Sequence, residues 1–414
     1  WSVGEIPLKK ISGSHTLFVT YSNPLLKDMR ENGIMFDWLY FTQEFPGKGR
    51  PGHEEAQAAF RKLISASTTN TPIMMENPPD MARKTFVFTR GNWLDKGNEV
   101  SAGTPPLLNP FPDKAPANRL GLAQWMIDDK NPLTARTIVN RVWEQLFGTG
   151  LCETLEDMGT QGMPPSHPEL LDHLAWQFTH DDQWRLKALI RKIVLSSTYK
   201  QSAIVSPEAQ AYDPANRYLS HSPRVRLSAE QVRDKVLAVS GLLSEKMYGP
   251  GVMPYQPDGI WQSPYNGLTW IPSKGEDKYR RALYTYWKRT APYPSMILFD
   301  GNTREVCAAR RIRTNTPLQA LVTLNDSVYI EAAGALALRM REHADSPSGQ
   351  IRYGYERAMG KPITPAREAA LLTLYEKTSR PFQKTSRTKE TPVDWGLVLV
   401  ANAILNLDEF LTKD

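Results

Sequence analysis

The stretch TARTIVNRVWEQLFGTG, residues 134–150, determines the fold class of this chain. Its apolar side chains recur at helical spacing, and they are Ile138, Val139, Val142, Trp143, Leu146 and Phe147. Gly148 stands where glycine is common, just past a helix end, because glycine adopts a left-handed backbone without strain. The pattern predicts an α-helix with one buried face.

Two capping boxes mark further helix starts. In SHPELLDHLAWQF (166–178), Ser166 is the cap and Glu169 follows three residues later. Ser228 and Gln231 repeat the device before VRDKVLAVSGLL. Each box predicts a helix that begins directly after its serine.

Thr-Pro pairs also mark helix starts, because threonine can cap a helix and proline suits its first residue. These pairs stand at 316–317, 364–365 and 391–392. We therefore predict a mainly α-helical domain over residues 117–414. A long aromatic loop insert at 253–296 interrupts it, punctuated by Gly, Pro and Asn.

The N-terminal part alternates like β-strand. SHTLFVTYS (14–22) and MFDWLYFT (35–42) each place apolar and aromatic residues at every second position. Because an isolated strand pair is marginal in water, we predict that residues 1–45 belong to a larger β-structure. Its other strands precede Trp1 or come from elsewhere.

Residues 46–116 are dense in proline, which predicts an extended path along a surface. Within them we expect one helix at 53–67 and a short edge strand at 84–91. The chain of 414 residues begins with neither Met nor a signal peptide. We expect it to be part of a longer polypeptide with its targeting segment upstream.

Composition narrows the function classes. The net charge of +6 is spread along the chain, without the dense basic stripe of a nucleic-acid-binding protein. The chain has two cysteines, Cys152 and Cys307, and the sequence does not determine whether they form a disulfide. No Cys-x-x-Cys-His motif is present, so the chain's own motifs bind no c-type haem. No apolar run reaches the length of a membrane span.

Four arginines gather within ten positions just before the predicted helix start at 316–317, namely Arg304, Arg310, Arg311 and Arg313. Helical spacing is one option for REVCAARRIR (304–313). Guanidinium groups beside a helix N-terminus suit a carboxylate, sulfate or phosphate, so an acidic or sulfated sugar is one candidate ligand. The alternative is internal pairing that ties the insert to the helices, with carboxylates of Asp300, Glu305, Asp326 or Glu331 as partners.

The aromatic insert is the second candidate site. Flat aromatic faces suit the apolar faces of sugar rings, and the predicted exposed platforms are Trp261, Tyr265, Trp270 and Tyr293. The alternative is that the aromatic residues are core. RRALYTYWKRT (280–290) then reads as an amphipathic element that buries Leu283, Tyr286 and Trp287.

Other chemistry has little support. Three histidines, at 167, 173 and 180, lie six and seven residues apart and lack the spacing of a zinc helix. Glu156, Asp157 and Asp172 are carboxylates whose separation the sequence does not determine. The chain has no nucleophile elbow, phosphate-binding loop or dinucleotide fingerprint.

Seven separated blocks, in order, resemble one family, the planctomycete-specific domain one, a domain of unknown function in cytochrome-c-associated proteins of planctomycetes and relatives. The blocks are NPLTARTIVNRVWEQLFGTGL, DMGTQGMPPSHPELLDHLAWQF, SSTYKQS, LSAEQVRDKVLAVSGLL, RRALYTYWKRTAP, FDGNTREVCAARRIRTNTPLQALVTLND and ANAILNLDEFL. The resemblance covers about residues 80–414. It implies a secreted or periplasmic protein that is encoded near polysaccharide-degrading enzymes, with haem c on an upstream segment or a partner.

The opening segment GSHTLFVTYSN…MFDWLYFTQEF is similar to the last two strands of a carbohydrate-binding β-sandwich of the family-six type. This resemblance covers about forty residues. It implies that the upstream part of the same polypeptide completes the sandwich.

Two functions follow from these resemblances, and the family context favours the first. In the first, the chain is the substrate-facing part of an extracytoplasmic, haem-dependent sugar oxidoreductase. In the second, it is a non-catalytic carbohydrate-binding or scaffold module of a glycan-uptake complex at the outer membrane or cell surface. An enzyme needs a pocket where a loop arginine meets a carboxylate such as Asp300 or Glu305. A module needs only an exposed platform, with its arginines paired internally.

Overall fold

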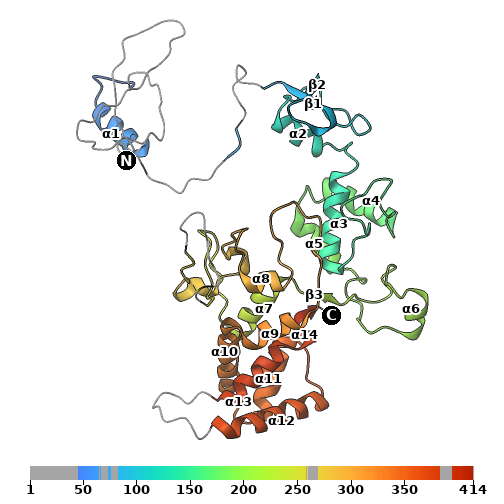
Figure 1. Ribbon diagram of the computed structural model, residues 1–414, viewed down its shortest axis with the longest axis vertical. Coiled ribbons are helices and arrows are strands. Elements are labelled where there is room, and N and C mark those ends of the chain that lie inside the picture. Colours follow the sequence, from blue (N-terminus) through green and yellow to red (C-terminus); the bar gives the residue numbers. More distant parts are fainter. Residues whose placement is uncertain are drawn as a thin grey trace. The chain divides into compact units, whose positions relative to one another are not determined.

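The computed structural model describes residues 45–64, 66, 73–75, 83–257, 259, 269–382 and 394–413. The two strands predicted within residues 1–45 lie outside this part. The chain divides into two compact units between Glu99 and Val100, and each unit is described by itself (Figure 1).

The first unit contains one described helix and most of a strand pair. Helix α1 (His53–Ile64) has acidic residues in its first turn and basic residues in its last turn, which suits the helix dipole. Strands β1 (Thr85–Phe88) and β2 (Lys96–Val100) form a two-stranded sheet, and the short 3-10 helix η2 (Thr89–Gly91) follows β1. The predicted helix and edge strand are confirmed.

The second unit is mainly helical, as predicted. Its helices are α2 (Arg119–Met126), α3 (Thr134–Phe147), α4 (Pro168–His180), α5 (Leu186–Val194), α6 (Pro207–Tyr212), α7 (Ala229–Ser240), α8 (Pro294–Leu298), α9 (Pro317–Asn325), α10 (Ser327–His343), α11 (Pro347–Met359), α12 (Pro365–Phe382), α13 (Trp395–Leu405) and α14 (Asp408–Leu411). The described part of the insert contains the 3-10 helices η3 (Gly275–Tyr279) and η4 (Ala282–Tyr284). Strands β3 (Val225–Arg226) and β4 (Thr412–Lys413) are short.

Helices α3, α4 and α5 enclose the first hydrophobic core. Val139 is fully buried, and Trp143 stacks on Phe147 with ring centroids 4.3 Å apart. On α4 the buried residues are Leu171, Leu174, Ala175 and Phe178. The helical spacing of these side chains accounts for one buried face on each helix.

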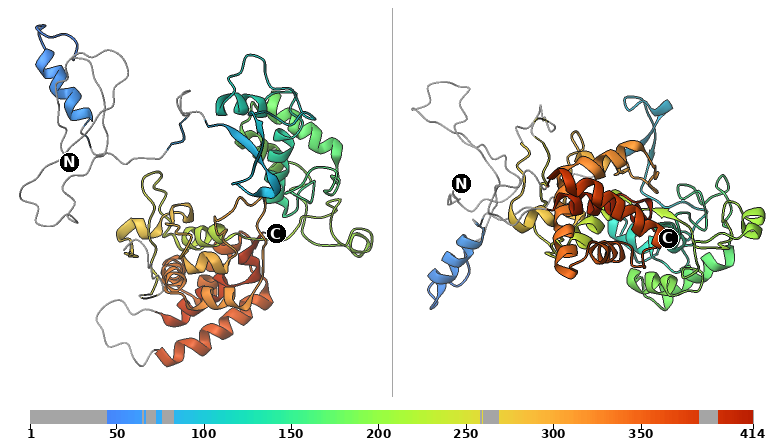
Figure 2. Two further views of the ribbon diagram at one scale, coloured as in Figure 1. Left: turned by 45° about the horizontal axis from the view of Figure 1, so that its top comes forward. Right: turned by 90° about the horizontal axis from the view of Figure 1, so that it is seen from below.

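The second core is larger and centres on α13. This helix packs against α10 and α12 (Figure 2), and residues from α7, α8 and α11 complete the cluster. Buried residues lie all round α13, which explains its almost continuous apolar sequence WGLVLVANAIL. Its one buried amide, Asn402, donates to the carbonyl oxygen of Thr323 at 3.0 Å.

A short strand pair joins distant parts of the second unit. Strand β3 pairs antiparallel with β4, with Val225 opposite Lys413. Asp408 accepts from both Arg224 and Arg226, at 2.7 and 3.3 Å. The Nζ of Lys413 donates to the carbonyl oxygen of Leu146 at the end of α3. The C-terminal segment therefore contacts α3 as well as the strand before α7.

Two of the three predicted helix-end signals are confirmed. Gly148 ends α3 with a φ of 81°, and the capping box of Ser228 with Gln231 is formed. The predicted box at Ser166 is wrong. Helix α4 begins at Pro168 without a side-chain cap, because the Ser166 hydroxyl contacts the His167 ring and the Leu151 carbonyl instead.

The Thr-Pro starts had mixed outcomes. Thr316 holds the cap position of α9 but makes no side-chain cap bond. Thr364 accepts from the N–H of Arg367 at the start of α12. The pair at 391–392 lies outside the described residues, and α13 begins at Trp395 with Asp394 as its cap.

Gly121 in α2 lies where no other residue fits. A Cβ built there would lie 1.9 Å from the carbonyl oxygen of Pro116 and 2.7 Å from the Phe111 ring. The loop before α2 therefore packs directly on the helix backbone.

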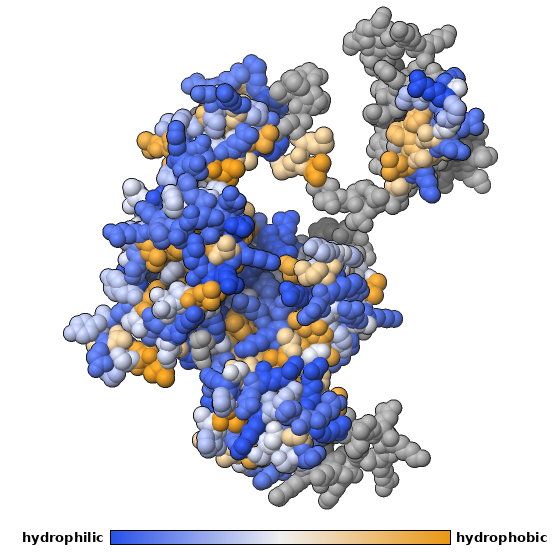
Figure 3. All heavy atoms as spheres, turned by 180° about the vertical axis from the view of Figure 1, so that it is seen from behind, coloured by the Kyte–Doolittle hydropathy of each residue, from blue (hydrophilic) through white to orange (hydrophobic). Residues whose placement is uncertain are grey.

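Within the part of the chain that the structure describes, no single helix is long and apolar enough to cross a membrane. Helices α9 and α10, bent by 58°, meet the criteria of length and composition only as a pair. Seven residues of α10 are buried in the protein, including Ala332 and Leu336. On the face in Figure 3, apolar residues lie in small groups among hydrophilic ones, as on most protein surfaces.

Candidate functional site

The arginine loop, defined as residues 300–316, is not helical, so the helical option for 304–313 is wrong. Asp300 closes the loop at its base. Its carboxylate accepts from the backbone N–H of Thr314 at 2.7 Å and from the Thr314 hydroxyl at 2.9 Å. Asp300 therefore holds the backbone of the loop in place rather than pairing with an arginine.

Three arginines of the loop each meet a carboxylate from a different part of the second unit. Arg310 Nε lies 2.9 Å from Glu156, which precedes α4. Arg311 Nη1 donates to Glu230 on α7 at 2.6 Å. Arg313 Nη1 lies 3.2 Å from Glu144 on α3. The loop thus contacts both helical clusters through ion pairs.

These partners differ from the predicted ones. Asp326 accepts from the N–H of Val328 and caps α10. Glu331 accepts from Lys278 and Tyr279, at 2.7 and 2.6 Å. Glu305 is exposed on the loop. Internal ion pairing is therefore confirmed for three arginines of the loop, but their partners are not the carboxylates that we predicted.

The ion pairs differ in burial and so in their electrostatics. The side chain of Glu144 is 5% exposed, and burial raises the pKa of its carboxyl against the opposing charge of Arg313. Burial also acts to raise the pKa of Glu230, but hydrogen bonds from Arg311 and the backbone outweigh it and hold that pKa below its ordinary value. The Arg310–Glu156 pair is about half exposed on both sides.

Arg304 is exposed and contacts the aromatic insert. Its guanidinium lies 4.9 Å from the centre of the Trp287 ring. The indole N–H of Trp287 donates to the carbonyl oxygen of Thr303 at 3.3 Å. Trp287 is half-buried and packs on the second core, so Arg304 connects the loop to the aromatic insert.

A buried arginine organises the described part of the insert. Arg280 is 1% exposed and donates to the backbone carbonyls of Lys246, Tyr248 and Pro250. It also lies 3.7 Å from the centre of the Tyr284 ring. Several carbonyl acceptors satisfy a buried guanidinium without a carboxylate.

The predicted aromatic platform is not confirmed. Tyr293 is 2% exposed, and its hydroxyl donates to the Tyr255 carbonyl at 2.8 Å, so its prediction as an exposed platform is wrong. Trp270 is half-buried, with its indole stacked on Tyr293 at 5.7 Å. Trp261 and Tyr265 lie outside the described residues. In the alternative amphipathic element, Leu283 is 70% exposed rather than buried.

Three charged side chains of α7 hold the loop and the insert together. Glu230 meets the arginine loop, Arg233 donates to the Lys278 carbonyl at 2.9 Å, and Asp234 accepts from the N–H of Ala282 at 2.7 Å. Arg233 is 5% exposed. The spacing of the three residues places them on one helix face. The sequence held a signal for this, since Arg233 falls inside the apolar stripe of α7.

Burial perturbs several groups around Arg233. It raises the pKa of Tyr293 to about 12 and that of Tyr329 still further. It also raises the pKa of the Asp326 and Asp234 carboxyls, against hydrogen bonds from the backbone and the charge of Arg233. Such clusters occur both in active sites and in structural networks.

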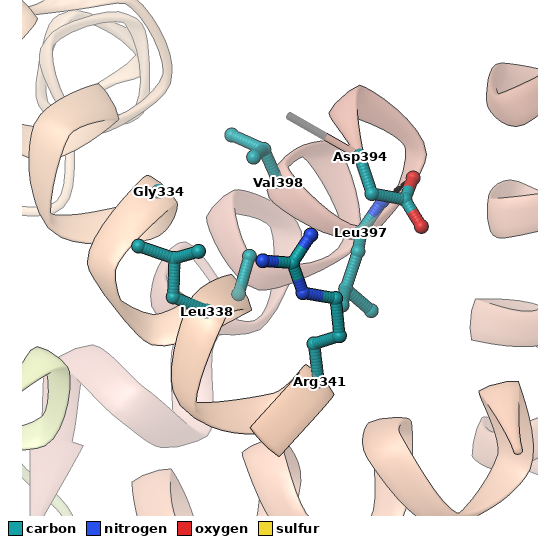
Figure 4. Close-up of a pocket in the computed structure, with 7 residues that line it drawn as sticks. Gly334, Leu338, Arg341, Asp394, Leu397 and Val398 are labelled. Carbon is teal, nitrogen blue, oxygen red and sulfur yellow. Dashed lines mark hydrogen bonds between the residues drawn. The ribbon is translucent and has the colours of Figure 1, made fainter. Parts of the chain in front are cut away.

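One small hollow lies between α10 and α13. It encloses about 120 Å³, and Leu338 and Leu397 line it, with Arg341 and Asp394 beside them (Figure 4). Drug-sized ligands fill pockets of about 300–1,000 Å³. Asp394 is engaged with the N–H of Leu397 and the hydroxyl of Tyr375. This hollow is too small to hold a sugar chain.

Other candidate groups are dispersed. Among the described residues, no three His, Cys, Asp or Glu side chains gather as metal ligands would. Cys152 is buried and Cys307 exposed, and both are free thiols. Asp172 pairs with Arg136 at 2.6 Å, and Asp157 accepts from the N–H of Gly159.

Comparison with known proteins gives one match. The family model PSD1, described as a protein of unknown function (DUF1553), matches residues 118–375, more than half of the chain. No curated protein and no solved structure matches the chain significantly.

Proposed function

This chain belongs to the PSD1 family of proteins of unknown function (DUF1553), and from that premise we propose that it is a non-catalytic carbohydrate-binding or scaffold module. In this proposal it is part of an extracytoplasmic, cytochrome-c-associated protein linked to polysaccharide use. Haem c is carried by an upstream segment or by a partner. The surroundings are a glycan-uptake complex at the outer membrane or cell surface.

One observation carries the proposal, namely that three arginines of the loop form ion pairs with carboxylates inside the protein. Arg311 and Arg313 meet Glu230 on α7 and Glu144 on α3, which belong to different helical clusters. Arg310 adds a third contact, to Glu156. A loop with this arrangement acts as a clamp that holds the two clusters as one rigid scaffold.

The alternative is the substrate-facing part of a haem-dependent sugar oxidoreductase. It needs a loop arginine and a loop carboxylate that face a common pocket. Asp300 instead accepts two hydrogen bonds from Thr314, and Tyr293 lies inside the protein. These contacts favour the module over the enzyme.

A glycan array with the purified full-length protein tests the proposal. The array includes neutral, sulfated and uronic-acid glycans, and each glycan that is retained is then assayed for oxidation with ferricytochrome c as acceptor. We expect retention of at least one glycan without reduction of the acceptor. Oxidation of a retained glycan would make the chain catalytic, and retention of none would remove the carbohydrate-binding role.

Variants of the loop test the clamp itself. Arg311→Gln removes the partner of Glu230, so the melting temperature should fall while glycan retention persists. Arg304→Gln is the matched control, because Arg304 is exposed and its guanidinium lies over the Trp287 ring. Loss of glycan retention in Arg311→Gln at an unchanged melting temperature would instead make Arg311 a ligand-binding residue.

A further inference from the structure

Helix α4 carries an exposed aromatic residue that the core does not use. The buried face of α4 is formed by Leu171, Leu174, Ala175 and Phe178. Trp176 lies on the other side and is 54% exposed. By contrast, Trp125 and Trp143 are less than a tenth exposed. The fold therefore gains little from a large indole at position 176.

The indole of Trp176 is held in a defined orientation. It stacks on the ring of His180, one turn further along α4, with centroids 4.7 Å apart and planes at 12°. The His180 ring is fixed in turn, because its Nδ1 lies 2.7 Å from the Thr179 hydroxyl and 3.1 Å from the Trp176 carbonyl. A ring held in this way loses little conformational freedom when a ligand packs on it.

A polar pair flanks the indole on the other side. Asp172 lies one turn before Trp176, so the two side chains share a helix face. The carboxylate of Asp172 accepts from Arg136 Nε at 2.6 Å, and the two side chains are 56% and 34% exposed. Arg136 Nη1 also donates to the Pro132 carbonyl at 2.5 Å, which fixes the guanidinium. The pair places an exposed acceptor beside remaining guanidinium donors.

We propose that Trp176, Asp172 and Arg136 form a binding platform for a neutral sugar ring. The apolar C–H face of the ring packs on the indole. Two adjacent hydroxyls meet the pair, one donating to the carboxylate and the other accepting from the guanidinium. This site rests on the proposed carbohydrate-binding function and names its ligand class.

Charge selects a neutral rather than an acidic sugar. The hydrogen bond from Arg136 lowers the pKa of the Asp172 carboxyl, so this group is ionised at neutral pH. A uronate or sulfate placed beside it would be repelled, and the guanidinium already has its counter-charge. The platform therefore differs in ligand from the acidic-sugar site that the arginine loop suggested.

Affinity electrophoresis of the full-length chain tests the site, with gels that contain β-glucan, xylan, mannan or the acidic alginate. We expect one of the neutral polysaccharides to retard the wild type. Trp176→Ala should weaken the retardation about tenfold, since an aromatic contact contributes up to about that factor. Trp93→Ala is the matched control, because Trp93 is 69% exposed and belongs to the first unit instead of helix α4.

A second variant separates binding from folding. Asp172→Asn keeps the size of the side chain and removes its charge, so it should also weaken retardation by the neutral polysaccharide while the circular dichroism spectrum is unchanged. Equal retardation of the wild type, Trp176→Ala and Asp172→Asn would overturn the platform and leave the proposed function intact. Retardation by none of the gels, with an empty glycan array, would overturn both.

Discussion

Replacement of Arg313 by alanine tests how the arginine loop holds the fold. The variant leaves the carboxyl of Glu144 without its cationic partner, in a position where the side chain is only 5% exposed. Burial already raises the pKa of Glu144 with Arg313 present, and without it the carboxyl must either stay charged in a poor environment or take up a proton. Protonation is the cheaper route and limits the cost.

The size of the effect follows from this limit. A glutamate in the unfolded chain has a pKa of about 4.3. Holding Glu144 protonated in the folded state at pH 7 therefore costs up to about 3.7 kcal/mol, at about 1.36 kcal/mol for each pH unit. Breaking a buried ion pair by removing one partner costs about 3–5 kcal/mol, which agrees. We therefore expect Arg313→Ala to lower the free energy of unfolding by about 3–4 kcal/mol at pH 7.

The pH dependence identifies the cause. In the variant the folded state binds a proton that the unfolded state releases above pH 5, so its stability falls as pH rises. The loss relative to wild type should shrink by about 1.4 kcal/mol for each unit from pH 7 toward pH 5. Urea unfolding followed by tryptophan fluorescence, repeated at each pH, measures it.

Two controls accompany the experiment. Arg310→Ala removes a half-exposed pair, so its cost should stay under about 1 kcal/mol and vary little with pH. Adding Glu144→Gln to Arg313→Ala removes the orphaned charge and should restore most of the loss. A loss below about 1 kcal/mol at every pH for Arg313→Ala would refute the view that this pair is a buried clamp.

Three further predictions use paired substitutions or pH. Gly121→Ala should destabilise the protein, because its Cβ would lie 1.9 Å from a backbone carbonyl oxygen. Gly334→Ala in α10 meets open space and should stabilise the protein by about 0.5–1 kcal/mol. Melting temperatures that shifted in the same direction for both variants would contradict this. Ser228→Ala removes a formed capping box and should cost about 1 kcal/mol, while Thr316→Ala, which removes no side-chain cap bond, should cost less in the same urea titration. Burial raises the pKa of Tyr293 from 10.0 to about 12, so the stability that the neutral hydroxyl contributes is present below pH 10 and is lost as pH rises toward 12. Tyr293→Phe should therefore make the free energy of unfolding depend less on pH over that range. An unchanged pH profile would count against the burial of this side chain.

Local signals predicted much of the fold because their partners lie within a few residues. The glycine at 148 and the pair of Ser228 with Gln231 act through bonds within one helix turn, and both formed as expected. The box at Ser166 failed for a tertiary reason, since the Leu151 carbonyl lies close enough to contact its hydroxyl. Helix limits are therefore readable except where another segment competes for the capping group.

The candidate site was less predictable. Arg311 pairs with Glu230, 81 residues away in sequence, and no local pattern distinguishes that carboxylate from the nearer ones. Tyr293 lies in a proline-rich stretch that suggests exposure, yet it is buried. The exposure of Trp176 was readable, because Leu171, Leu174 and Phe178 mark the opposite face of the helix.

The sequence by itself determined the mainly helical class, most helix starts and ends, and the faces that the helices bury. These depend on backbone geometry and on side chains one turn apart, which the order of residues specifies directly. Only the tertiary structure decided which carboxylate each loop arginine meets and which aromatic rings of the insert are buried. Ion pairs and burial depend on segments that folding brings together from distant parts of the chain, and their spacing in sequence carries no record of that meeting.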